Sequence, residues 1–180
     1  MTISGQIQKY IENSKLNGKL CKWDKPIINV YVMQISAPIS GKENYYYDIK
    51  RGIDTWNSAL RSCGINLSLN QITTPTNADI IVHWTKVGRV FEGMCKYPSI
   101  INGTLKKVSI EIGLKNEYSG KNTTEESIFF VIMHEFGHAL GLGHGVEVDD
   151  VMFVPHQKNI SIPSENDLYV LKHIYNNFPC

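Results

Sequence analysis

The sequence has little of what would mark a membrane protein or a nucleic-acid-binding protein. None of its 180 residues belongs to an apolar run that approaches the ~18 residues of a membrane-spanning helix. An excess of one charge is also missing, because the formal net charge is +1 and the lysines are dispersed. This balance removes the electrostatic case for nucleic acid or an anionic membrane as a partner. Repeats and low-complexity tracts are absent, and a hydrophobic content of 42% fits a globular protein with a buried core.

Cysteine is scarce, and no two cysteines have the C-x-x-C spacing that would indicate a thiolate zinc site. An even count of four permits two disulfides with three possible connectivities. The alternative is that some are buried thiols, which pack as small hydrophobic side chains. We expect at least one disulfide, because the chemistry indicated below is commoner outside the cell. The four are Cys21, Cys63, Cys95 and Cys180.

The N-terminus has neither the basic start nor the apolar stretch of a signal peptide. We therefore expect either an intracellular protein or a secreted one whose leader has been removed. Residues 1–21 are expected to be an appendage or a short activation segment. Ile3, Ile7 and Ile11 suggest a short helix there, with a frayed terminus as the default. Residues 22–180 are long enough for a single domain.

The most informative segment is an H-E-x-x-H-x-x-G-x-x-H motif that runs from His134 to His144. Residues four apart lie on one face of an α-helix, so His134 and His138 can reach the same metal ion. Gly141 is expected to take a left-handed conformation at the helix C-terminus and to turn His144 back toward them. Three imidazoles leave one position on zinc for water, and Glu135 is placed to act as the general base.

The complete motif predicts a zinc-dependent endopeptidase that hydrolyses peptide bonds of protein substrates through an activated water. A shorter H-E-x-x-H pair would also fit two surface histidines with structural roles. One alternative is a zinc-stabilised module that holds a peptide without cutting it, although such a module has no use for Glu135. Another is a peptidoglycan or other amide hydrolase, which would use the same metal machinery.

Hydrophobic periodicity predicts an α+β fold, with a mixed twisted sheet of four to five strands and three main helices. His83 falls on a predicted strand, where a structural or surface role is expected. The last helix should begin at Ser164, with Asp167 at its third position. The zinc helix should begin with a capping box from Thr123 to Glu126. Strands are predicted at 27–32, 65–69, 78–84, 94–96 and 108–112, and a long helix at 45–63.

The zinc motif is followed by a methionine, Met152, eight residues beyond His144 in the segment Asp150–Phe153. This arrangement resembles the metzincin clan of zinc metallopeptidases, and the interval resembles the matrixins and related bacterial enzymes. The likeness extends to an opening segment, a central strand and a C-terminal helix. These are 22–27, 78–82 and 164–168, followed by Ile174 and Tyr175.

The resemblance implies a zinc-dependent protease fold with one catalytic zinc, held by the three histidines of the motif. Glu135 would be the base, and Met152 would form a hydrophobic floor beneath the ligands. The substrate would lie as an extended strand against the edge of the sheet. The loop from Phe153 to Pro163 would border its specificity pocket. The residues implied as substrate-binding are Gly93, Met94, Cys95, Lys96 and Pro155.

The sequence also departs from the family pattern. The structural-zinc segment of matrixins has no match between Gly88 and Glu111, so neither a second zinc nor calcium is assigned. Residue 145 is glycine where matrixins usually have serine, and Val154 replaces the metal-binding tyrosine of astacin-like relatives. Cys21 could cap the zinc in a latent form, although a disulfide or a free thiol is preferred. We expect a monomer that acts on protein or peptide substrates.

Overall fold

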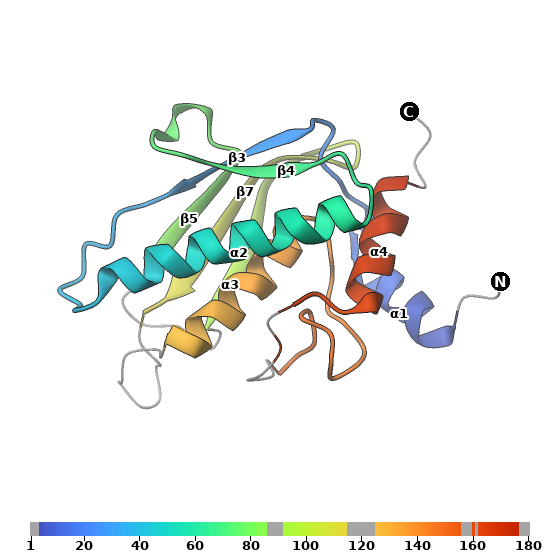
Figure 1. Cartoon of the computed structure of the whole chain (residues 1–180). Helices are drawn as coiled ribbons and strands as arrows, with labels where there is room; N and C mark the ends of the chain where they lie inside the picture. Colours follow the sequence, from blue (N-terminus) through green and yellow to red (C-terminus); the bar gives the residue numbers. More distant parts are fainter. Residues whose placement is uncertain (1–3, 86–91, 115–124, 156–159, 161, 177–180) are drawn as a thin grey trace.

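The described part of the chain forms a five-stranded mixed sheet with helices packed on one face (Figure 1). The computed structural model describes residues 4–85, 92–114, 125–155, 160 and 162–176. The strand order is β4-β3-β5-β7-β6, with every neighbouring pair parallel except β7 and β6. The predicted fold class is therefore confirmed, and β6 is an antiparallel edge strand. The strands are β3 Ile27–Val32, β4 Ser68–Ile72, β5 Ile80–Thr85, β6 Gly93–Ile101 and β7 Thr104–Gly113.

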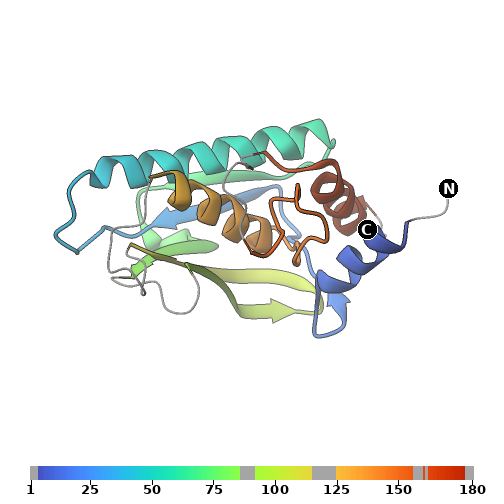
Figure 2. The same cartoon turned by 90° about the horizontal axis from the view of Figure 1, so that it is seen from below.

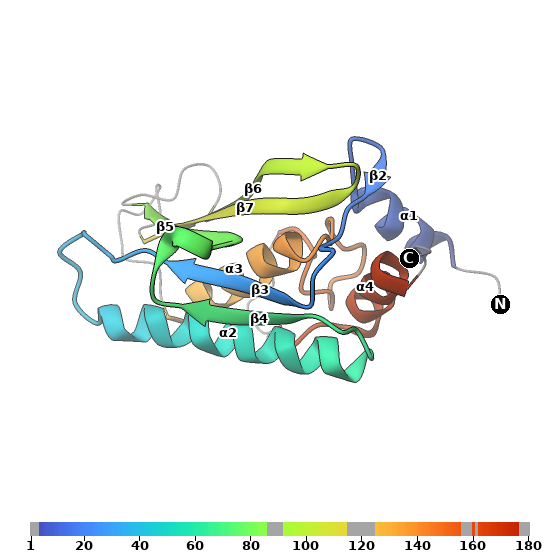
Figure 3. The same cartoon turned by 90° about the horizontal axis from the view of Figure 1, so that it is seen from above.

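Two long helices, α2 and α3, cover the same face of the sheet (Figures 1 and 2). At one end of the sheet, α1 packs against α4, although these helices lie near opposite ends of the sequence (Figure 3). No helix in the described residues combines the length and apolar character needed to cross a membrane. The helices are α1 Gly5–Asn13, α2 Lys42–Ser62, α3 Glu125–Ala139 and α4 Glu165–Asn176, with a 3₁₀ turn η1 Pro75–Asn77 and a hairpin of β1 Lys15–Leu16 and β2 Lys19–Leu20.

Helix α2 buries the stripe that its sequence period predicts, and Gly52 on this stripe lies against α3. A Cβ added to Gly52 would lie 2.6 Å from Ile132 Cγ2, so the two helices approach closely at this point. The predicted start of α4 is confirmed by reciprocal hydrogen bonds. Ser164 N donates to Asp167 Oδ2 at 2.8 Å, and Asp167 N donates to Ser164 Oγ at 3.0 Å. Thr123, the predicted cap of α3, lies outside the described residues.

Strand β4 begins three residues later than the alternation at 65–69 predicts. The chain first closes α2, since Ile65 N donates to the carbonyl of Leu60 and Gly64 has a φ of 68°. Ile65 and Leu67 are buried there, but pairing with β3 starts only at Ser68. The alternation therefore marks burial rather than strand pairing. Strands β6 and β7 are longer than predicted, and Pro98 is tolerated because β6 is an edge strand.

The N-terminal segment forms helix α1 and the β1–β2 hairpin, where a frayed terminus was the default expectation. Ser4 caps α1 by accepting a hydrogen bond from Ile7 N at 3.3 Å. Tyr10 is fully buried and Ile11 is nearly so. Ile3 of the predicted stripe lies outside the described residues.

The described cysteines form no disulfide with one another, because Cys21, Cys63 and Cys95 are all free thiols. The expectation of a disulfide is therefore not met among these three, and Cys180 lies outside the described residues. Cys21 donates weakly to the carbonyl of Lys19, at an S···O distance of 3.6 Å. Buried thiols of this kind behave as small hydrophobic side chains.

Candidate metal centre and active site

From Ile128 on, helix α3 is buried on almost every side, which holds the first part of the motif in place. His134 and Glu135 are each only 3% exposed despite their polar side chains. Trp56 of α2 donates its indole N–H to the carbonyl of Met133 at 3.0 Å and so ties the two helices together. The apolar residues that bury the helix are Ile128, Phe129, Val131, Ile132, Met133, Phe136 and Ala139.

The C-terminus of α3 ends in a Schellman motif that turns the chain toward the third histidine. Leu142 N donates to the carbonyl of Gly137 at 3.0 Å, and Gly141 N donates to the carbonyl of His138 at 2.9 Å. Gly141 has the predicted positive φ, 103°. A Cβ at this position would also lie 2.5 Å from the carbonyl oxygen of Cys21. Glycine is therefore required here by both conformation and space.

Aromatic side chains from distant elements satisfy the last carbonyl groups of α3. The Tyr97 hydroxyl donates to the carbonyl of His138 at 2.9 Å, and the Trp23 indole donates to that of Ala139 at 2.8 Å. The Tyr175 hydroxyl donates to the next carbonyl at 3.0 Å. Burial raises the pKa of both tyrosines, so their hydroxyl groups stay protonated and keep donating. These bonds fix the end of the helix from which the chain turns.

The three histidines of the motif converge on one point. A ligating nitrogen from each of His134, His138 and His144 lies within 4.8 Å of the other two. The ring centroids are 4.7 Å apart for His134 and His138, and 5.0 Å apart for His138 and His144. His134 is buried and His144 is exposed, so the group opens toward solvent on one side. Such a group could hold a metal ion.

Hydrogen bonds to carbonyl groups determine which ring nitrogen of two histidines carries a proton. His134 Nδ1 lies 3.0 Å from the carbonyl oxygen of Val151, and His138 Nδ1 lies 2.8 Å from that of Leu142. A carbonyl only accepts, so Nδ1 of each neutral ring is the donor. The lone pair is then left on Nε2, which is the form of imidazole that binds metals.

Met152 packs directly beneath the helix that carries His134 and His138. Its side chain is fully buried. A Cβ added to Gly137 would lie 2.2 Å from the sulfur of Met152 and 3.1 Å from Trp56. Glycine at position 137 therefore makes room for the thioether, at the cost of a residue that favours helices less than alanine does. This role of Gly137 was not predicted from the sequence, although a glycine inside a helical pattern is a recognisable signal.

Asp150 organises the loop between His144 and Met152, a role that was not predicted from the sequence. Its Oδ2 accepts hydrogen bonds from the backbone of Val146 at 3.0 Å and of Glu147 at 2.9 Å. Its Oδ1 accepts from Ser164 Oγ at 2.6 Å and from the side-chain amide of Asn166 in α4 at 3.1 Å. The loop is thereby fixed to the start of α4.

Gly145 is the position at which the sequence departs from the usual matrixin serine. A Cβ here would lie 2.7 Å from Asp150 Cβ, so the buried aspartate fills the space that a side chain would need. Gly145 N donates to the carbonyl of Met152 at 2.7 Å. The glycine therefore lets the loop close tightly over the methionine segment.

Glu135 lies next to the histidine group with one oxygen unsatisfied. Among the described residues, its Oε2 is buried without a hydrogen-bond partner. Burial raises the pKa of the carboxyl group to about 8. A buried carboxylate with a spare acceptor can take up and release a proton near neutral pH, which is what a general base needs.

The edge strand β6 contains four of the five residues predicted to bind substrate. Gly93 and Cys95 face the helices, and a Cβ on Gly93 would lie 2.6 Å from Glu135 Oε1. Burial and the Glu135 charge raise the pKa of the Cys95 thiol. Lys96 faces the other side of the sheet and forms a 2.6 Å ion pair with Glu111. The two remaining predicted residues are Met94, which alternates with Gly93 and Cys95, and Pro155, which is exposed in the loop after Met152.

Comparison with protein-family models matches residues 22–176 to the matrixin family. The chain belongs to the matrixin family. A search of the curated proteins gave no significant match. Membership supports a zinc metallopeptidase in general, and the three-histidine group of this matrixin could hold the metal ion. The match begins where the resemblance does, at Lys22, and leaves helix α1 outside the matched residues.

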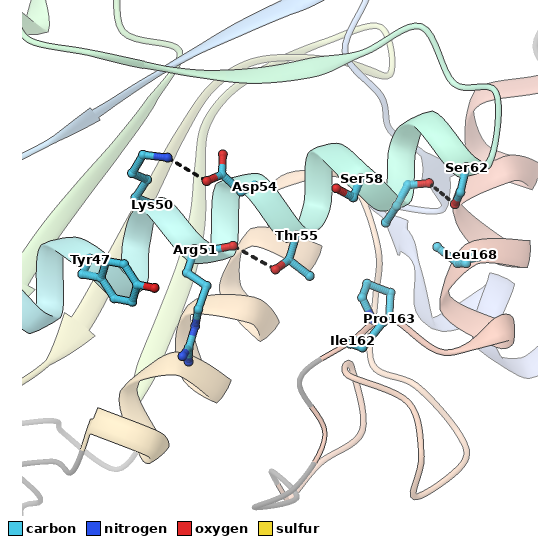
Figure 4. A pocket seen from close by; sticks show the side chains of 11 residues that line it. Tyr47, Lys50, Arg51, Asp54, Thr55, Ser58, Ser62, Ile162, Pro163 and Leu168 are labelled. Carbon is cyan, nitrogen blue, oxygen red and sulfur yellow. Dashed lines mark hydrogen bonds and ion pairs between the residues drawn. The ribbon is translucent and has the colours of Figure 1, made fainter.

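A separate pocket of about 720 Å³ lies on the outer side of α2 in this matrixin (Figure 4). Thr55 and Ser58 of α2 form one wall, and Ile162, Pro163 and Leu168 form another. No residue of the histidine group lines this pocket. It is therefore distinct from the candidate metal centre.

Proposed function

We propose that the protein is a zinc-dependent endopeptidase in which His134, His138 and His144 hold the metal and Glu135 is the general base. The observation that carries the proposal is the convergence of the three imidazoles beside a buried carboxylate with a spare acceptor. Three neutral imidazoles suit zinc and leave a position for water or substrate. The Nδ1–carbonyl hydrogen bonds support this assignment, because they orient Nε2 of two rings for ligation.

A zinc ion in this group would polarise the scissile carbonyl and lower the pKa of a coordinated water to about 7. Glu135 would accept the proton of that water through its unsatisfied Oε2 and would deliver it to the leaving amine. Its burial supports this role, since the carboxylate is shielded from bulk solvent beside the histidine group. Met152 would support the ligands from below without binding metal.

Strand β6 is the proposed binding edge for substrate. Its outer edge is free of a neighbouring strand in the described sheet, so an extended peptide can add to it by backbone hydrogen bonds. Gly93 and Cys95 face Glu135, which would place the scissile bond of such a peptide beside the carboxylate. A module that only binds peptide would have no need of the buried, unpaired Glu135 at this edge.

Casein or gelatin zymography, with and without a chelator, tests the proposed function. We expect protein-degrading activity that the chelator abolishes and that added zinc restores. The His138→Ala variant should lose both zinc and activity. Zinc-loaded protein that binds peptides without cutting them would identify a binding module, and activity on amides other than peptide bonds would identify a different hydrolase.

A further inference from the structure

The C-terminal end of helix α1 lies directly against the loop that carries the third histidine. The hydroxyl of Ser14, at the end of α1, accepts a hydrogen bond from Gly143 N at 2.9 Å. The side chain of Asn13 donates to the carbonyl of His144 at 2.9 Å. Ser14 is 2% exposed, and its hydroxyl also donates to the carbonyl of Tyr10 at 2.9 Å. The contact joins residues about 130 positions apart, since one bond spans 129 and the other 131.

Gly143 occupies a position that the zinc motif leaves open, and the N-terminal segment requires glycine there. A Cβ on Gly143 would lie 2.0 Å from the carbonyl oxygen of Asn13 and 2.5 Å from Ser14 N. The backbone of Gly143 is not in the left-handed region, so only the space taken by residues 13–14 excludes a side chain. Glycine at position 143 is therefore what allows residues 13–14 to pack against this loop.

A second contact joins α1 to the other side of the histidine group. The buried hydroxyl of Tyr10 donates to Asp167 Oδ1 at 2.5 Å. Asp167 Oδ2 accepts from Val151 N at 2.8 Å, and the carbonyl of Val151 is the partner of His134 Nδ1. Helix α1 is thus hydrogen-bonded directly to the backbone of His144, and it is linked to the ring of His134 through Asp167 and Val151.

We propose that residues 4–14 are an intramolecular brace that positions His144 for metal binding, with Asn13 and Ser14 as the positioning residues. The inference rests on the proposed assignment of the three histidines as zinc ligands. His144 is exposed and is the only one of the three outside α3, so the helix that positions the other two does not position it. Bonds to its own carbonyl and to the preceding N–H supply that orientation. Partners that orient metal ligands typically contribute 10–100-fold to metal affinity.

Competition between the 180-residue protein and a chromogenic zinc chelator tests this brace. Ser14→Ala removes one oxygen atom and should weaken zinc binding by about tenfold, the lower end of that range. Gly143→Ala should weaken it further, because the added methyl group displaces residues 13–14. Gln8→Ala changes an exposed residue of the same helix and is the matched control. The visible spectrum of the cobalt(II)-loaded Ser14→Ala protein should also differ from that of the wild type.

A purely structural role for α1 gives a different result. It would lower the unfolding temperature of the metal-free variants and leave the zinc affinity of the folded protein and the cobalt spectrum unchanged. Ser14→Ala protein that is folded and binds zinc within twofold of the wild type would overturn the brace alone. Wild-type protein that binds no zinc would overturn both the brace and the proposed function. Ser14→Ala answers the question even if Gly143→Ala fails to fold.

Discussion

Gly93 gives Glu135 the space in which its carboxylate lies. A Cβ built on Gly93 would be 2.6 Å from Glu135 Oε1 and 2.8 Å from its Cγ, well inside contact distance. The glycine is on edge strand β6 and the glutamate on helix α3, so the contact fixes the sheet edge relative to the proposed base. The two residues are far apart in the sequence, so it is the packing of α3 against β6 that brings them together.

This contact predicts that Gly93→Ala impairs turnover while zinc is retained. The added methyl group must push the carboxylate aside, and a displacement of about 1 Å can cost roughly 100-fold in rate. Peptidase activity and zinc content of the purified variant check the prediction. Thr73→Ala changes an exposed residue outside β6 and α3; it is the control and should stay close to wild type in both. A Gly93→Ala enzyme with normal turnover would show that Glu135 is not held by this contact.

The Gly137→Ala substitution is predicted to destabilise the protein, although helix propensity alone would favour alanine. Alanine is favoured over glycine in a helix interior by about 1 kcal/mol. Here the methyl group would meet the buried sulfur of Met152, and such overpacking costs about 1–3 kcal/mol. We expect Gly137→Ala to lower the free energy of unfolding of the metal-free protein, measured by urea denaturation.

Gly5→Ala is the matched control for this measurement, because no atom lies within 4 Å of the added Cβ on helix α1. It should leave the unfolding free energy unchanged or raise it. Gly137→Ala should lower the unfolding free energy less in a Met152→Ala background than in the wild type, since the added methyl group no longer meets the sulfur of Met152. An unfolding free energy that rises in Gly137→Ala would contradict the packing of Met152 against this helix.

Because Tyr10 is buried beside Asp167, we expect the folded protein to lose stability at alkaline pH. Burial and the neighbouring Asp167 carboxylate raise the pKa of its phenol well above the usual 10.0. Above about pH 10 the unfolded chain releases this proton and the folded chain keeps it, so stability falls as the pH rises. The Tyr10 hydroxyl therefore contributes its full stability below pH 10 and loses it toward the raised pKa of the folded state.

Comparison with Tyr10→Phe isolates this contribution from the other tyrosines. The wild type should unfold at a higher urea concentration than the variant at pH 8, and the difference should shrink at pH 11. The hydrogen bond to a charged acceptor makes a difference of about 1.5–3 kcal/mol reasonable at the lower pH. A difference that is the same at both pH values would show that the phenol of the folded protein titrates normally.

Local patterns in the sequence predicted much of the fold and the histidine group. Strand β3 and the cap at Ser164 depend on neighbouring residues, and both match their predictions. The spacing of the motif alone predicted that Gly141 would turn the chain at the end of α3, as it does. These features follow from helix geometry and capping, which involve contacts a few residues apart.

The contacts that were not predicted join residues far apart in the chain. The packing role of the glycines at 93, 137 and 143 could not be predicted, because each makes room for an atom of another element. The docking of α1 was likewise invisible, since its stripe of isoleucines indicates a buried face without indicating the partner. The expected disulfide was not found among the described cysteines, which are free thiols. Such features depend on tertiary packing, which overrides local pattern.

The most direct test of the account is to measure zinc content and peptide turnover together in Glu135→Gln. Glutamine has nearly the same size and fits the space beside Gly93, but it is neutral and cannot serve as a proton acceptor. We predict one zinc ion per chain, as in the wild type, with turnover reduced by about 10²–10⁴, the usual contribution of a general base. A zinc-loaded Glu135→Gln protein that cleaves peptides at the wild-type rate would contradict the proposed role of Glu135.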